Sequence, residues 1–573
     1  MTLNKPRDVV SVELITDYNS IREEIGLKVE ESFLYQALGL DAWRDVAPTL
    51  VKTDTNEYYI IAKQIEEGNL SVNGRASGHI SRLNIKTIYY GSYFTWESSQ
   101  VISDPPPTTP AEALAKVLKS DNVIANKDMP LSRYREFQKE FSVTLNSDEK
   151  KAAKISVYKI DTSGSAAAGN KDRAAAVETA LELINQVSTV SREDKDVIRE
   201  NLLKNQGDKF GLLDTLLGRK KLSCLLASSR INLQELSPLP WEQLKDGILA
   251  LYKGQQAFVL SPEPMENPLL QKTGDYNNLR DALDSLIGDA ILGIEEKNLG
   301  LGLVHEIGLD KVADATDLFR TWREQSAHRD LPYYVIAGQA TRYALENAVT
   351  FVASALEAKK QITEKDTEAK FLALFNEFKL KYNCSYLDIK KYFVVLHAGT
   401  RTPYASLSSD FLLNTEMNSL KIDAGILVFH NGILRACSDM ARSLVLTREG
   451  KDVYDLTEKL MVESAIPAAK HGSTGSDVYW AGVLPLVKME NTLKEWGMLP
   501  PGASIRDSYN RDIGHIMAKQ EPVTLGLVKA ETNLKLQSGM IGAVEYQWPY
   551  KNHALGIEDH YLVTEKKGIN ISR

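Results

Sequence analysis

Cysteine is scarce in this chain of 573 residues, which holds Cys224, Cys384 and Cys437 and no others. The three are far apart and odd in number, and no CxxC pair indicates a cysteine metal site. So few thiols fit a reducing compartment. We therefore expect the protein in the cytoplasm.

Long apolar runs and a net positive charge are also missing. No stretch of about 20 consecutive apolar residues is present, which is the length that a membrane-spanning helix requires. Residues 1–17 carry several charges and no sustained apolar run, so we expect no secretory signal there. Lys and Arg number 68 against 76 Asp and Glu, and the formal charge of −8 offers no general attraction to nucleic acid or an acidic membrane. We expect a small-molecule or peptide partner.

Length and composition indicate a globular protein of several domains, with 43% hydrophobic and 25% charged residues. Domains of about 150 residues would give roughly three or four. We predict an α/β (α+β) chain with an amino-terminal α/β region over residues 1–210, a second α/β domain over 211–330 and a different domain over 331–573. Small polar residues at 163–170 predict a flexible loop or surface link.

A helix–turn–helix pattern occurs twice in the last region. Residues 340–360 predict a long helix, after which Thr363 can cap a new helix with Asp366 in its first turn. One face of this new helix is apolar, which predicts that it is buried: Phe371, Leu374, Phe375 and Phe378. Residues 465–477 weakly resemble residues 355–366, and this echo predicts two similar halves.

Five potential metal ligands are spread through the last third of the chain: Asp423, Asp439, His515, Glu545 and Glu558. Four carboxylates and one imidazole suit a pair of hard divalent cations with bridging oxygens, because anionic oxygens offset the charge of two ions held close together. Single Asp, Glu and His residues are ordinarily solvated or structural. The local sequence around each residue therefore decides whether a metal-binding role is expected.

The context of the two aspartates is a predicted hairpin, in which two strand-like runs flank a loop that contains Gly432. If Phe429 pairs with Ile433, the paired numbers sum to 862, and 862 − 423 = 439 places Asp423 opposite Asp439. Like charges that face each other destabilise a sheet, so this hairpin predicts a bound cation. A two-residue loop would instead shift the register and turn one carboxylate toward solvent.

Five short segments resemble, in the same order, motifs of the pita-bread metallopeptidase family, which includes aminopeptidase P, prolidase, methionine aminopeptidase and creatinase. The segments are residues 421–425, 438–443, 514–515, 539–545 and 556–564. This resemblance covers about residues 333–573 and implies a pita-bread domain with pseudo-twofold halves. The second domain resembles, more loosely, the amino-terminal domain of the creatinase and aminopeptidase P branch. Residues 1–210 have no clear counterpart.

The resemblance also implies a role for each ligand. Asp423 and Asp439 would bind one ion, His515 and Glu545 the other, and Asp439 and Glu558 would bridge the two. Two divalent ions (Mn, Fe, Co or Zn) would lower the pKa of bound water and polarise the substrate carbonyl, while Glu545 shuttles a proton. A homodimer is implied as well.

The chain departs from the family's pattern in three places. The interval of 439 − 423 = 16 residues between Asp423 and Asp439 is longer than the family's usual one. The position of one substrate-facing histidine falls near Tyr404, and that of the other falls at Gln520. Tyr404 can still donate a hydrogen bond to an oxyanion, which makes it a candidate catalytic residue beside Glu545.

Two classes of function fit these residues. The first is a dinuclear-metal-dependent hydrolase of the Xaa-Pro aminopeptidase or creatinase type, which cleaves an amide or peptide C–N bond through a metal-activated water. Retention of costly buried charges favours it, although loss of both histidines leaves a lyase-type reaction at the same metals open. The second class is a catalytically inactive pita-bread binding module, like the peptidase-like domain of a histone-chaperone subunit.

Overall fold

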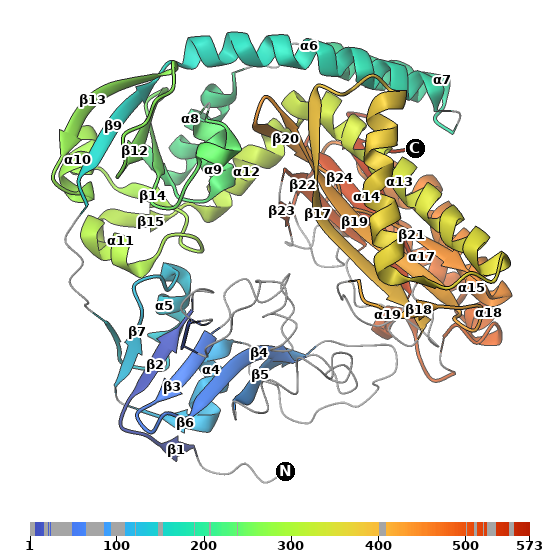
Figure 1. Ribbon diagram of the computed structural model, residues 1–573, viewed down its shortest axis with the longest axis horizontal. Helices are drawn as coiled ribbons and strands as arrows, with labels where there is room; N and C mark the ends of the chain where they lie inside the picture. Colours follow the sequence, from blue (N-terminus) through green and yellow to red (C-terminus); the bar gives the residue numbers. More distant parts are fainter. Residues whose placement is uncertain are drawn as a thin grey trace.

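Three sheet-containing regions follow one another along the chain in the computed structural model (Figure 1). The structure describes residues 6–16, 21, 23–24, 49–64, 85–92, 109–120, 122–146, 153–187, 189–204, 208–237, 239–399, 408–499, 501–508, 513–519, 521–523, 534–548 and 555–573. None of the helices in these ranges combines the length and apolar character needed to cross a membrane.

In its described residues, the first region contains a six-stranded sheet. Its strands, in sheet order, are β5 (Lys86–Ser92), β4 (Tyr58–Gln64), β3 (Thr49–Thr53), β2 (Val12–Ile15), β7 (Val123–Ala125) and β8 (Val143–Leu145). The helices α4 (Pro110–Val117) and α5 (Leu131–Phe137) and the small pair β1 (Arg7–Asp8) and β6 (Leu118–Lys119) accompany this sheet. Thr109 caps α4 by accepting a hydrogen bond from the Glu112 N–H.

The second region is a seven-stranded mixed sheet. Its strands, in sheet order, are β13 (Leu270–Tyr276), β9 (Ile155–Ile160), β12 (Gln256–Ser261), β11 (Leu249–Lys253), β10 (Cys224–Ala227), β14 (Leu292–Ile294) and β15 (Val312–Asp314). Its helices are α8 (Lys209–Lys220), α9 (Arg230–Leu236), α10 (Leu279–Ile287), α11 (Leu301–Ile307) and α12 (Thr316–Ser326). The boundary expected at residue 210 stays a prediction. Because β9 pairs with β12 and β13, we propose that the first boundary lies between β8 and β9.

Helix α6 (Thr162–Gln186) links the second region to the third along one edge of the molecule (Figure 1). The loop predicted at residues 163–170 is wrong, because these residues form the first turns of α6; their alanines have the highest intrinsic helix propensity. The Arg173 guanidinium donates to the Leu202 carbonyl at 2.8 Å, which holds α6 against α7 (Arg192–Leu203).

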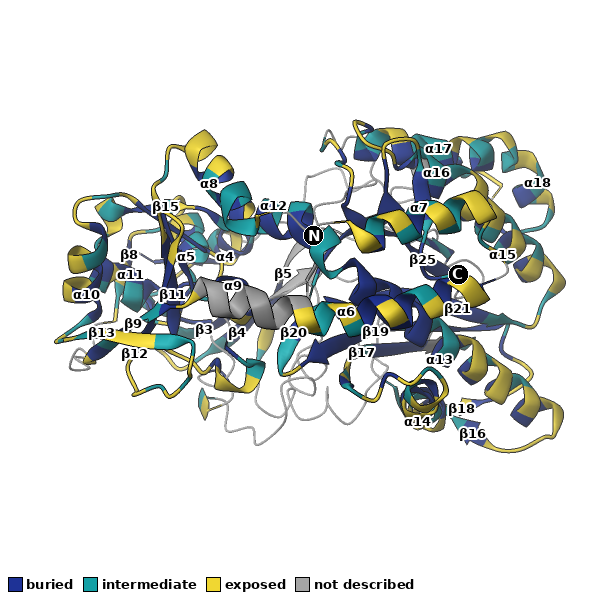
Figure 2. Ribbon diagram, turned by 90° about the horizontal axis from the view of Figure 1, so that it is seen from above, coloured by how far each residue is buried: buried dark blue, intermediate teal, exposed yellow. Residues whose placement is uncertain are grey.

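The third region consists of two halves, each with a sheet covered by helices. In the first half, α13 (Leu331–Glu357) and α14 (Glu364–Lys381) cover β17 (Leu387–Ala398), β19 (Ser419–His430), β20 (Ile433–Cys437) and β21 (Met440–Val445). In the second half, α15 (Arg448–Leu460), α16 (Ile466–Ala468), α17 (Gly475–Lys488), α18 (Glu490–Glu495) and α19 (Ile505–Ser508) accompany β23 (Glu521–Val523), β22 (Gly514–Ala518), β24 (Ile541–Trp548), β25 (Leu555–Val563) and β26 (Gly568–Asn570). A short pair, β16 (Ile362–Thr363) and β18 (Leu412–Leu413), flanks α14. The strands are buried and the helices turn exposed faces outward (Figure 2).

The helix starts of the two halves confirm the predicted repeat. Thr363 and Asp366 form a capping box at α14, and Thr474 and Asp477 form the same box at α17. The apolar face predicted for α14 is buried: Phe371, Leu374, Phe375 and Phe378. Local polar contacts therefore start the second helix of each half, and core packing holds it.

The predicted hairpin forms, but its predicted register is wrong. Asn431 and Gly432 alone make the loop, with φ of 52° and 75°, as a two-residue type I′ turn requires. His430 therefore pairs with Ile433. A bulge then adds one residue to β20, and Asp423 pairs with Ala441.

The bulge keeps both aspartates on one face of the sheet in spite of the shorter loop. The sum of the paired residue numbers rises from 430 + 433 = 863 beside the loop to 423 + 441 = 864 beyond the bulge, which corresponds to the one extra residue. Asp439 lies between β20 and β21, but the Ser438 N–H donates to the Ile426 carbonyl, so the paired sum of 864 continues through this segment and leaves Asp439 on the side of Asp423. The two carboxylates are diagonal neighbours and do not face each other directly.

A buried charge cluster ties the second region to β22. The Glu235 carboxylate on α9 pairs with Lys519, which follows β22, and lies 3.3 Å from the Lys209 Nζ. The Lys519 Nζ is also 3.1 Å from Asp330. Burial raises the pKa of Glu235, but both lysines outweigh it and hold this pKa well below its usual range. The charged form of Glu235 thus stabilises the junction.

Glu235→Gln is expected to destabilise the protein by about 3–5 kcal/mol near neutral pH, because it leaves two lysines buried without their shared anion. The folded pKa lies below the unfolded one, so this contribution is complete above pH of about 4.3 and is lost as pH falls through the folded value. The gap between the two proteins in denaturant unfolding should shrink below pH of about 4. Glu242→Gln, which breaks an exposed pair with Lys390, should cost under about 1 kcal/mol. Equal effects of both changes would contradict the prediction.

Candidate metal centre

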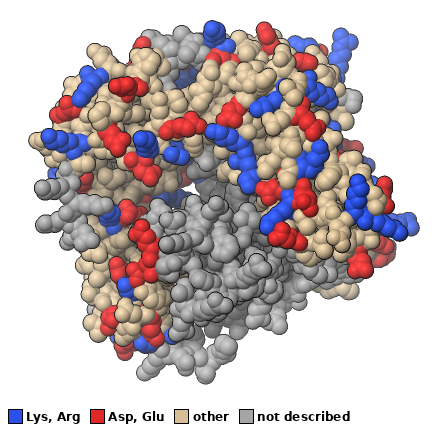
Figure 3. Space-filling model, viewed as in Figure 1, with Lys and Arg blue, Asp and Glu red and all other residues tan. Residues whose placement is uncertain are grey.

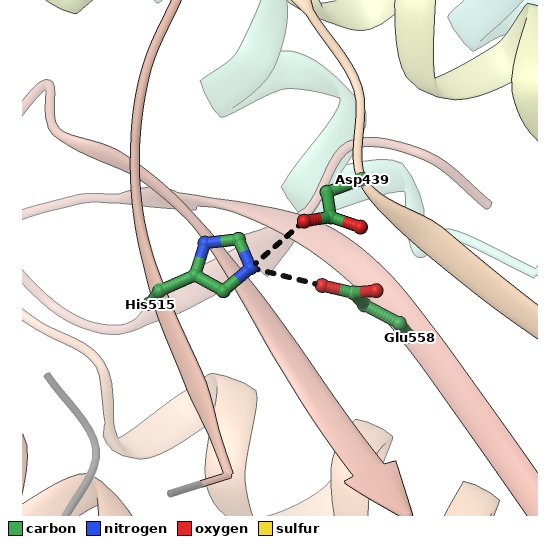
Figure 4. Close-up of side chains that lie close together, drawn as sticks. All are labelled: Asp439, His515 and Glu558. Carbon is green, nitrogen blue, oxygen red and sulfur yellow. Dashed lines mark ion pairs between the residues drawn. The ribbon is translucent and has the colours of Figure 1, made fainter. Parts of the chain in front are cut away.

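The candidate ligands come from both halves of the third region and meet where the two sheets adjoin. Asp439 follows β20, His515 lies on β22 and Glu558 lies on β25. Figure 4 shows these three side chains pointing toward one another. One ligand atom from each lies within 4.8 Å of the others.

Two glycines allow the backbone to approach closely where the ligands are placed. Gly514, directly before His515, has φ of 144°, and a Cβ there would lie 2.1 Å from the Ala543 carbonyl oxygen. Gly425 on β19 passes the bend that carries Asp439, and a Cβ there would lie 2.4 Å from the Ser438 carbonyl oxygen. A side chain at either position would push a ligand-bearing segment away.

The distances within the trio fit a single small cation. The His515 Nε2 is 3.3 Å from the Asp439 Oδ2 and 3.2 Å from the Glu558 Oε1. Ligand atoms bound at about 2.1 Å, with angles between right-angled and tetrahedral, are about 3.0–3.4 Å apart. The Nε2 and the two carboxylate oxygens therefore have the spacing of neighbouring ligands. We refer to Asp439, His515 and Glu558 as the triad.

The electrostatics of the triad require positive charge. Burial raises the pKa of Glu558 well above its usual range, and the Asp439 and Glu545 charges add to this effect. Burial lowers the pKa of His515, but Asp439 and Glu558 outweigh it and raise this pKa well above its usual range. The triad thus favours a cation, which either an imidazolium or a bound divalent ion supplies.

The remaining two predicted ligands lie beside the triad on either side of Lys421. The Lys421 Nζ is 2.8 Å from the Asp423 Oδ2 and 3.2 Å from the Glu545 Oε1. Burial raises the pKa of Asp423 to about 7; Lys421 opposes this rise, and Glu545 and Asp439 add to it. Glu545 also faces Glu558 directly across β24 and β25. We expected Asp423 and Asp439 to face each other as like charges. That arrangement is found instead at Glu545 and Glu558.

A second set of contacts joins the sheets behind the ligands. The Arg442 guanidinium on β21 donates to the Asp559 carboxylate on β25 at 2.6 Å. Asp559 is fully buried; burial raises its pKa, but Arg442 and Arg573 outweigh this and hold it at about 2. The Asp439 N–H donates to the His560 Nε2 at 3.1 Å. These contacts fix β21 and the Asp439 bend against the strand that carries Glu558.

The sequence pattern did not single out Lys421. Strand alternation could have identified Lys421 as a neighbour of the site, because it lies two residues before Asp423 and therefore on the same face of β19. Tyr404 and Gln520, the two positions that replace family histidines, lie outside the described residues. The catalytic role expected of Tyr404 stays a prediction, as do the ligand roles.

The face of the molecule in Figure 3 has no charge of one predominant sign over its described part. Acidic and basic side chains are interspersed over the described part of the face in Figure 3. Attraction for a cation comes from the buried carboxylates.

Comparison with known proteins gives a fold and no sequence family. No family model matches the sequence, and no curated protein matches it significantly. Among solved structures, it is similar to the X-prolyl aminopeptidase of Caenorhabditis elegans, described as a cytosolic enzyme with a di-nuclear active site, at 12% identity and a TM-score of 0.56 over 98% of this chain and 86% of that one.

Two further solved structures align with a smaller part of the chain. The prolidase of Pyrococcus horikoshii aligns at 18% identity and a TM-score of 0.45, over 64% of this chain and 98% of that one. The amino-terminal domain of a FACT complex subunit from Cicer arietinum (chickpea) aligns at 13% identity and a TM-score of 0.47, over 64% of this chain and 95% of that one.

The comparison confirms the predicted fold. The third region has the pita-bread fold with pseudo-twofold halves. Because the nematode alignment covers 98% of this chain, the likeness of fold extends into the described part of residues 1–210, for which the sequence suggested no counterpart. At this low identity the likeness concerns fold alone.

Replacement of His515 by alanine is expected to abolish stabilisation by divalent cations. A cation that binds only the folded protein stabilises it by about 2.7 kcal/mol at a concentration of 100 times its Kd. Thermal unfolding of the wild type with and without Mn²⁺ or Zn²⁺ measures this effect. His471→Ala is the matched control, since His471 is exposed and accepts from the Ser538 N–H, away from the triad. An equal upward shift in the His515→Ala variant would contradict a cation site at the triad.

Proposed function

We propose that this protein is a metal-dependent hydrolase that cleaves the C–N bond of peptides with proline in the second position. The observation that carries the proposal is the triad, in which two carboxylate oxygens and one imidazole nitrogen converge within 4.8 Å. The X-prolyl substrate of the nematode structure suggests the substrate class. The predicted homodimer and cytoplasmic location stay predictions.

The residues of the triad would hold the ion by the chemistry of their donor set. Two anionic oxygens and one neutral nitrogen suit Mn²⁺, Fe²⁺, Co²⁺ or Zn²⁺. A divalent ion bound there supplies the Lewis acidity that activates water and polarises a carbonyl. The expected pair of ions is a separate matter, because Asp423, expected at one ion, and Glu545, expected at the other, both pair with Lys421.

Glu545 is the candidate for moving the proton. Its carboxylate lies beside the triad, is partly exposed and faces Glu558 across the strands. A general base of this kind must lie within hydrogen-bond reach of the water that it deprotonates. The contact with Lys421 orients the Glu545 Oε1.

A binding module is the second candidate function, and the contacts of Glu545 are the observation that favours it. The Glu545 Oε1 is engaged by Lys421 and by the Gln547 amide at once. A carboxylate held for structural reasons would bridge the two sheets in this way without any catalytic role. Turnover distinguishes the two candidates.

We expect the protein loaded with Mn²⁺, Co²⁺ or Zn²⁺ to release the first residue from Xaa-Pro dipeptides and longer Xaa-Pro peptides, as mass spectrometry of the products would record. Creatine-like amides and sulfonium acids belong in the same panel, because they test the other reactions of this fold. His515→Ala and chelation should both reduce turnover to background, since each removes the Lewis acid.

Glu545→Gln provides a sharper control. It retains the shape of the side chain and removes the base, so we expect kcat to fall while metal-induced stabilisation persists. A fully metal-loaded wild type without turnover on any peptide would remove the peptidase assignment and favour the binding module.

A further inference from the structure

Lys421 is a buried cation placed between Asp423 and Glu545, two carboxylates that the expected pair of ions would need, one at each ion. Its side chain is 4% exposed, and its Nζ contacts Asp423 at 2.8 Å and Glu545 at 3.2 Å. Asp423 belongs to the first half of the pita-bread region and Glu545 to the second. The Lys421 ammonium therefore links the two sheets by charge, as an ion shared between them would.

The fold provides a slot for this lysine. Gly556 on β25 lies beside the Lys421 stem, and a Cβ at that position would be 2.3 Å from the Lys421 Cε and 2.6 Å from its Cδ. The Ser443 hydroxyl donates to the Gly556 carbonyl at 3.1 Å, and the Gly556 N–H donates to the same hydroxyl at 2.8 Å. Both contacts hold the glycine backbone beneath the lysine stem.

The Lys421 ammonium and the triad divide the predicted ligands into two sets. In the triad, the distances from the His515 Nε2 to Asp439 and Glu558 suit one ion, and one ligand atom of each residue lies within 4.8 Å of the others. Asp423 and Glu545 fall outside the triad and pair with the ammonium. An ion bound beside Asp423 would lie next to the ammonium, and the two positive charges would repel each other. The negative charge of Asp423 and Glu545 is already paired with the ammonium.

We propose that the Lys421 ammonium takes the place of the second cation, so that this chain binds one divalent ion, at Asp439, His515 and Glu558. This inference rests on the proposed metal-dependent function and departs from the two-ion site that the sequence predicts. Asp423 then acts as a positioning residue for Lys421 and binds no metal.

The stoichiometry of bound metal tests the proposal. Wild type, saturated with Mn²⁺ and freed of excess ion, should contain one ion per chain by elemental analysis. Its electron paramagnetic resonance spectrum should show the resolved hyperfine lines of an isolated Mn²⁺. Lys421→Met, which retains the apolar stem and removes the charge, should bind two ions and give a spectrum broadened by coupling between them.

Two matched variants show whether the number of bound ions depends on the positive charge at position 421, and not on side-chain size or on the loss of any lysine. Lys421→Arg retains a cation and should retain one ion. Lys391→Met removes a half-exposed lysine from the neighbouring strand β17 and should also leave one ion. Thermal unfolding shows whether each variant is folded, and if Lys421→Met is not, the ion count and spectrum of the wild type decide alone.

Each other outcome overturns a distinct claim. Two ions or a coupled spectrum in the wild type would overturn the replacement of a metal by Lys421 and leave the proposed hydrolase intact. One ion in a folded Lys421→Met variant would overturn the role given to the lysine. No ion in the wild type would overturn the proposed function, and the inference with it.

Discussion

Four carboxylates gathered in a buried seam between two sheets are the constraint on which this structure depends. Glu545 and Glu558 face each other across a strand pair, and Asp423 and Asp439 share one face of the adjoining sheet. Anions removed from water cost several kcal/mol each unless they are paired. Among the described residues, Lys421 and His515 lie at ion-pair distance from these carboxylates. The two sheets can therefore bury these carboxylates only together with positive charge. The chemistry of the site follows from which cation provides that charge.

Neither half of the pita-bread region could form this seam alone. The first half contributes Lys421 and both aspartates, and the second contributes His515 and both glutamates. The Arg442–Asp559 pair joins β21 to β25 where the sheets adjoin, and the Glu235–Lys519 pair anchors the end of β22 to the second region. The position of His515 thus depends on contacts on both sides of the seam. Geometry at the triad is a property of the assembled regions, because no single strand pair contains all three ligands.

Local features of the fold were predictable from the sequence, and features set by tertiary contacts were not. A capping box needs only two residues that are three apart, so Thr363 and Asp366 predict the start of α14 without reference to the rest of the chain. The hairpin between β19 and β20 was predictable from Gly432, but the bulge in β20 was not, because no residue type is required at such a position. The order of the motifs predicted the five candidate ligands together. The split of these ligands into a triad and a lysine-bound pair depends on how the sheets meet.

A pita-bread fold and a dinuclear site are separable properties, and Lys421 shows why. The fold depends on apolar alternation in the strands and on the capped helix pairs, which many sequences satisfy, and it persists at 12% identity. The charge of the site depends on single positions. A lysine two residues before Asp423 adds a positive charge to the seam, and its stem fits over Gly556 without displacing a strand. Such a change leaves the core unaltered while it changes how much further cationic charge the carboxylates require. The number of metal ions must therefore be argued from the charges within the seam, and likeness of fold does not determine it.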